Sequence, residues 1–95
     1  MTKLEIYREQ IDKIDSEIIK LYEERMEVVK GVINYKIENN IPILDTNRES
    51  AMLEKNLKKI ENEQLKKYYI SVLQGFLKAS KELQTDILNK TINKK

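Results

Sequence analysis

Apolar and aromatic side chains recur every three or four residues from position 4 to position 39, which is the period of one helix face. This stretch holds no proline and a single glycine, Gly31. The stripe is formed by Leu4, Tyr7, Ile11, Ile14, Ile18, Leu21, Arg25, Val28, Val32 and Tyr35. The pattern predicts one very long helix. Arg25 is the one charged residue on its stripe, and a buried cation needs either a carboxylate of the fold or an anionic ligand.

Two shorter helices are expected after the first one. Asn39 and Asn40 form a plausible stop, and Pro42 disfavours continuation of the helix. A second helix is predicted from Asp45 or Thr46, and its periodicity fades over residues 61–64. A third helix is predicted over residues 65–89. Its stripe consists of Leu65, Tyr69, Val72, Leu73, Phe76, Ser80, Gln84 and Ile87. The fold class is therefore all-α, with three helices per chain.

The length of the first helix has a consequence for assembly. Its 36 residues span about 54 Å, whereas a compact domain of this length has a radius of gyration of about 12 Å. Two shorter helices cannot cover such an overhanging stripe, so we predict an intertwined homodimer with C2 symmetry. Residues 1–95 are interpreted as one domain, with residues 1–3 and 90–95 as frayed ends.

Composition narrows the chemistry. The chain has 18 basic and 16 acidic residues, a formal net charge of +2, and no cysteine or histidine. This balance gives no general attraction to nucleic acid or membranes, and the commonest metal ligands and the commonest general base are missing. We therefore expect no metal, no cofactor, no nucleic acid and no membrane partner. Without a signal-like or membrane-spanning segment, the expected location is cytoplasmic.

Several polar residues occupy positions that suggest a binding site. Arg25 and Lys36 point within about 20° of each other along the first helix, so they could clamp one anion. Arg8 lies about 100° away from Arg25 around the same helix, and could serve the pocket of a partner chain. Ser80 and Gln84 interrupt the stripe of the third helix with neutral hydrogen-bonding groups.

Each of these residues also has an ordinary structural explanation. Arg8 and Lys36 alone are typical of solvated surface charges, and Ser80 alone is typical of core filler. The start of the second helix gathers Asp45, Arg48 and Glu49, which can act simply as helix-capping residues. Taken together, the cations, neutral donors and carboxylate favour an anionic ligand that carries a hydroxyl or ether oxygen.

These residues resemble the all-helical chorismate mutase family. The spacing is R-x16-R-x10-K-x8-D-x2-R-E on the first two helices, followed by S-x3-Q on the third, and the likeness runs over residues 4–88. The resemblance implies an intertwined homodimer of three-helix chains. It also implies rearrangement of chorismate to prephenate, which feeds phenylalanine and tyrosine synthesis without a nucleophile, metal or cofactor.

The resemblance further implies a role for each site residue. Arg25 and the other subunit's Arg8 would hold the two carboxylates, helped by Ser80. Lys36 and Gln84 would donate to the ether oxygen, and Glu49 would bind the ring hydroxyl beside the Asp45 segment. Arg48 would lie over the ligand.

Two other functions stay open. A lyase of the same fold, which releases pyruvate from isochorismate, has a pocket of similar chemistry. A non-catalytic helical dimerisation or regulatory module would explain the apolar periodicity, but it would not explain Arg25, Ser80 and Gln84 on apolar stripes.

Overall fold

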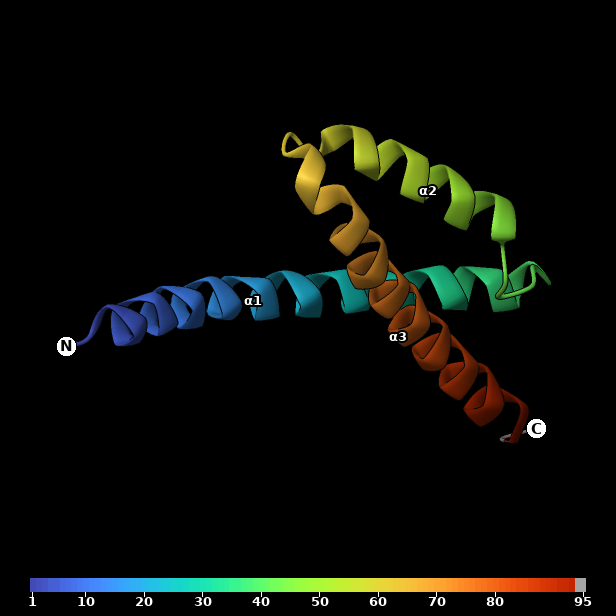
Figure 1. The fold of residues 1–95 in the computed structure, drawn as a ribbon. Coiled ribbons are helices and arrows are strands. Elements are labelled where there is room, and N and C mark those ends of the chain that lie inside the picture. The colour runs from blue at the N-terminus through green and yellow to red at the C-terminus, as the bar shows by residue number, and fades with distance from the viewer. Residues whose placement is uncertain (94–95) are drawn as a thin grey trace.

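The computed structural model describes residues 1–93, which form three α-helices and one 3-10 turn and contain no strand (Figure 1). In chain order the elements are α1 (Lys3–Glu38), α2 (Thr46–Lys59), η1 (Glu63–Leu65) and α3 (Lys66–Asn93). Helix α3 crosses α1 and packs against both α1 and α2 (Figure 1). The predicted all-α fold with a very long first helix is confirmed.

Both ends of α1 are fixed by capping interactions. At the start, the Thr2 side chain accepts a hydrogen bond of 3.1 Å from the Glu5 backbone N–H. At the end, Asn40 adopts a left-handed conformation with φ 55°. The backbone N–H of Ile41 then donates to the Lys36 carbonyl, and that of Asn40 to the Ile37 carbonyl, at 2.8 and 3.4 Å. These two bonds define a Schellman motif, which turns the chain away from the helix axis.

The remaining helix boundaries agree with the sequence pattern except at the end of α3. Asp45 caps α2, and its carboxylate accepts the Arg48 backbone N–H at 2.9 Å. The connection to α3 is tightened by η1, which the Asn62 side chain caps. Helix α3 continues to Asn93, past the expected end at residue 89, so residues 90–93 are helical. The rest of the predicted frayed end, residues 94–95, lies outside the described residues.

The buried core is confined to the region where α3 crosses α1. Ile33 of α1 and Leu73 of α3 are 1% and 3% exposed. The predicted stripe of α1 is different, because its first six members, from Leu4 to Leu21, are 47–62% exposed in the single chain. Leu65 of η1 and Val72 of α3 are also exposed. A large apolar surface on the N-terminal half of α1 is therefore left uncovered.

The overall shape follows from that uncovered half-helix. The longest dimension of the chain is 58 Å and the radius of gyration is 17.2 Å, against about 12 Å for a compact domain of this size. Figure 1 shows α1 projecting well beyond the crossing with α3. The predicted overhang is confirmed, while the homodimer inferred from it stays a prediction. Within residues 1–93, no helix is long and apolar enough to cross a membrane.

Candidate active site

A cavity of about 400 Å³ lies between α1, the connection before α2, the first turns of α2 and the middle of α3. Its apolar wall includes valines of α1 and Met52 and Leu77 from the other two helices. Seven of the eight predicted site residues line it: Arg25, Lys36, Asp45, Arg48, Glu49, Ser80 and Gln84. The folded chain thus gathers residues that are separated by up to 59 positions in sequence. Arg8, on the projecting part of α1, does not line this cavity.

Arg25 is held at the crossing of α1 and α3. Its guanidinium donates a hydrogen bond to the Ser80 hydroxyl and lies 5.6 Å from the centre of the Phe76 ring. The Ser80 hydroxyl in turn donates to the Phe76 carbonyl at 2.8 Å. No carboxylate among residues 1–93 lies within 4.0 Å of the Arg25 guanidinium. Of the two options left by the sequence, an anionic ligand therefore fits better than a carboxylate of the fold.

Lys36 is positioned by the chain that follows its own helix. The Schellman motif folds the connection back, so that the Lys36 ammonium donates to the Ile43 carbonyl at 2.8 Å. Lys36 and Ile43 are both half-buried. A lysine ammonium has three donors, and one bond to a carbonyl leaves two available in the cavity.

Ser80 and Gln84 are buried on α3, with 6% and 7% of their surfaces exposed. The Gln84 amide nitrogen donates to the Ser80 carbonyl at 3.2 Å, which occupies one of its two N–H groups. Its amide oxygen is buried without a hydrogen-bond partner in the described chain. Because a buried acceptor without a partner costs about 1–3 kcal/mol, the Gln84 amide is poorly explained by folding alone, and its second N–H group is available to donate to a ligand.

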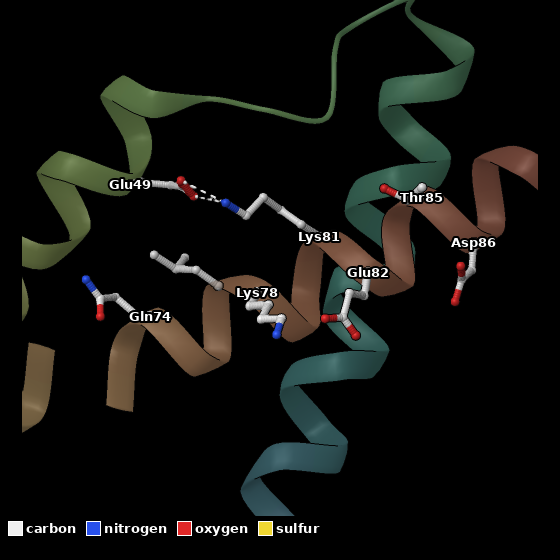
Figure 2. Close-up of a pocket in the computed structure, with 8 residues that line it drawn as sticks. Glu49, Gln74, Lys78, Lys81, Glu82, Thr85 and Asp86 are labelled. Carbon is white, nitrogen blue, oxygen red and sulfur yellow. Dashed lines mark hydrogen bonds and ion pairs between the residues drawn. The ribbon is translucent and has the colours of Figure 1, made fainter. Parts of the chain in front are cut away.

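The first turn of α2 supplies the acidic side of the cavity. Asp45 is engaged as the helix cap, and Arg48 is exposed at the cavity edge. The Glu49 carboxylate faces the Lys81 ammonium of α3 (Figure 2). The two groups are 3.2 Å apart. Four cationic and two acidic side chains line the cavity, so its net charge is positive. That charge suits a small molecule with more than one carboxylate.

Lys81 is the charged lining residue that the sequence did not reveal. It follows Ser80 directly but points about 100° away from it around the helix, off the apolar stripe. On sequence alone a lysine in that place is typical of a solvated surface. Its pairing with Glu49 depends on how α2 and α3 lie side by side, and no spacing within one helix reports that.

A larger and more open hollow of about 630 Å³ lies on the outer side of α3 (Figure 2). It is lined by Glu49, Gln74, Leu77, Lys78, Lys81, Glu82, Thr85 and Asp86. Of the predicted site residues it contains only Glu49. We therefore assign the site to the smaller cavity, in which basic groups converge with the buried Ser80 and Gln84.

Known proteins similar to this chain include chorismate mutases. A chorismate mutase of Methanocaldococcus jannaschii is 33% identical over 93 residues, covering 97% of this chain and 94% of that protein. A bifunctional chorismate mutase/prephenate dehydratase of Buchnera aphidicola (subsp. Acyrthosiphon pisum) is 38% identical over 89 residues. A T-protein of Haemophilus influenzae is 33% identical over 94 residues.

The extent of these matches differs between the relatives. The chain spans only 23% of the length of the Buchnera protein and 25% of that of the Haemophilus protein, although 93% and 98% of the chain are covered. No solved structure matches the chain. The family model described as chorismate mutase type II matches residues 7–85, which include every residue of the predicted site. The chain therefore belongs to the chorismate mutase type II family.

Proposed function

We propose that this chain is a chorismate mutase, which rearranges chorismate to prephenate on the route to phenylalanine and tyrosine. The observation that carries the proposal is that Arg25, Lys36 and Gln84 line one cavity, where Lys36 and Gln84 each keep N–H groups that no hydrogen bond of the fold uses. Family membership and a relative named chorismate mutase, matched over nearly its whole length, support the same activity.

The reaction suits the chemistry of the cavity. In this rearrangement one carbon–oxygen bond breaks while one carbon–carbon bond forms within the same molecule, and no proton or group leaves. No nucleophile or general base is therefore required of the protein. Catalysis depends on holding the reactive, compact conformer and on stabilising the charge that develops on the ether oxygen.

Each cavity residue has a role in this proposal. Arg25 holds one substrate carboxylate through its planar fork of donors, with Ser80 beside it. Lys36 and Gln84 donate to the ether oxygen, using N–H groups that their contacts with the Ile43 and Ser80 carbonyls leave available.

The remaining contacts come from the start of α2. Glu49 accepts a hydrogen bond from the ring hydroxyl, and Arg48 lies over the ligand. Asp45 keeps this turn in place by capping α2.

The second carboxylate is assigned to Arg8 of a partner chain. Arg8 and Arg25 belong to the same uninterrupted helix and are about 26 Å apart along its axis. Arg8 therefore cannot reach its own chain's cavity. A homodimer would cover the exposed apolar residues of the α1 overhang, since exposed patches of this kind mark interaction surfaces, and it could deliver Arg8 to the partner's cavity.

Direct assay of turnover tests the proposal. Purified protein mixed with chorismate should make the chorismate absorbance fall, and the product should be prephenate. Release of pyruvate from isochorismate, with chorismate left intact, would instead identify a lyase. Chorismate binding without any turnover would favour a regulatory module. The cytoplasmic location expected from the sequence stays a prediction.

A further inference from the structure

Lys81 makes a side-chain contact that ties Glu49, one of the two acidic residues of the cavity, to α3. Its ammonium lies 3.2 Å from one Glu49 carboxylate oxygen and 3.4 Å from the other. Figure 2 shows the lysine extended from α3 toward α2, with both contacts marked. Among residues 1–93, the Glu49 carboxylate has no other ion-pair or hydrogen-bond partner. The position of this carboxylate in the cavity is therefore set by Lys81.

The pair also stands at the boundary of the cavity. Glu49, Leu77 and Lys81 line both the cavity and the larger open hollow outside α3. The Glu49 side chain is 24% exposed and the Lys81 side chain 41%. The pair therefore lies where the cavity borders the open hollow, and the lysine is the more exposed of the two side chains.

This placement has an electrostatic consequence for a substrate with two carboxylates. An unpartnered Glu49 carboxylate in the cavity would repel such a substrate. Paired with Lys81, it can still accept a hydrogen bond, because a carboxylate has about four acceptor sites and one ammonium does not occupy them all.

We propose that Lys81 is a positioning residue that holds the Glu49 carboxylate in place to accept a hydrogen bond from the ring hydroxyl of the substrate. Lys81 thereby makes the enzyme select substrates that bear this hydroxyl. The inference rests on the proposed mutase function. It adds a role for a residue that does not itself touch the reacting atoms.

A purely structural role for Lys81 would have a different signature. Partly exposed ion pairs contribute little to stability, and α2 and α3 are also joined by a 2.9 Å hydrogen bond from the Asn56 amide to the Tyr69 hydroxyl. Neither Asn56 nor Tyr69 lines the cavity. Tyr69→Phe is therefore a matched control, because it removes a tie between the same two helices away from the site.

The test is a double-mutant cycle on kcat/KM for chorismate. Lys81→Met should lower kcat/KM about tenfold, whereas Lys81→Arg should restore most of the loss because it keeps a cation that can bond both oxygens. In the Glu49→Gln background, Lys81→Met should cause no further loss. Tyr69→Phe should leave kcat/KM unchanged.

A binding measurement completes the test when Glu49→Gln is too slow to assay. Lys81→Met should raise the inhibition constant of prephenate, which keeps the hydroxyl, more than that of a chorismate analogue without the ring hydroxyl, because only charge repulsion by the unpaired Glu49 affects the analogue. Lys81→Met could lower kcat/KM equally in the wild-type and Glu49→Gln backgrounds, or raise both inhibition constants equally. Either result would overturn the inference about Lys81 and leave the mutase function intact. A wild-type protein that does not convert chorismate would overturn both.

Discussion

The exposed stripe of α1 gives the sharpest prediction about assembly. Ile14 lies in the middle of the stripe and is 57% exposed in the single chain. Within an isolated chain, replacing it with alanine should be harmless, because alanine is the better helix former and little packing is lost. In the proposed homodimer the same side chain is covered by the partner, so Ile14→Ala should weaken association.

The size of the effect follows from the exposed fraction. Full burial of an isoleucine side chain contributes about 1.5–3 kcal/mol. Covering the 57% that remains exposed in one chain therefore contributes about 1–1.7 kcal/mol per copy. A C2 dimer carries the change twice, so the free energy of association should weaken by about 2–3 kcal/mol. The dissociation constant should then rise roughly 30- to 150-fold.

Sedimentation equilibrium over a range of concentrations measures this constant. Wild type should sediment at twice 11.3 kDa at micromolar concentration, and Ile14→Ala should dissociate at correspondingly higher concentrations. Ile92→Ala is the matched control, because Ile92 of α3 is also 57% exposed but lies beside Ile37 and Ile41, at the end of α1 opposite the overhang. It should leave the dissociation constant unchanged.

Two results would refute this reasoning. The first is a wild-type protein that stays a stable, fully helical monomer, because the α1 stripe would then be exposed in solution. The second is an equal response to Ile14→Ala and Ile92→Ala, because the stripe would then have no special part in association.

Three further predictions concern the site. Lys36→Ala should lower kcat by roughly 100-fold or more in a folded protein, because its ammonium donates to charge that appears only in the transition state; a change confined to KM would contradict this. Wild-type kcat should stay level through neutral pH, since the Gln84 amide does not titrate, whereas Gln84→Glu should lose activity as pH rises because its carboxyl donates only while protonated. Asp45→Ala should lower the free energy of unfolding by about 1 kcal/mol in urea titrations, while Asp45→Asn, which keeps a capping oxygen, should not.

The sequence predicted the features that depend on local spacing. The apolar period located all three helices, and the stop at Asn39 and Asn40 and the start at Asp45 or Thr46 agree with the end of α1 and the start of α2 within a residue or two. The polar interruptions at Arg25 and Ser80 also proved informative, since the two side chains meet where α1 crosses α3.

Features set by the arrangement of the helices could not be read from the sequence. Spacing within α3 gives the direction of Lys81 around its own helix, but it does not say that Glu49 of α2 lies opposite. The same limit applies to the Lys36 contact with the Ile43 carbonyl, which depends on the turn after α1. The assignment of Arg8 to a partner's cavity depends on a second chain and stays a prediction.

Mixed dimers test most directly whether the catalytic cavity of one chain is completed by Arg8 of the other. Arg8→Ala and Arg25→Ala homodimers should each be inactive toward chorismate. When the two are unfolded together and refolded, random pairing makes about half of the dimers mixed. Each mixed dimer has one site with both lesions and one with none, so activity should recover to about a quarter of wild type. With subunit exchange verified by tagged chains, absence of recovery would contradict the shared site.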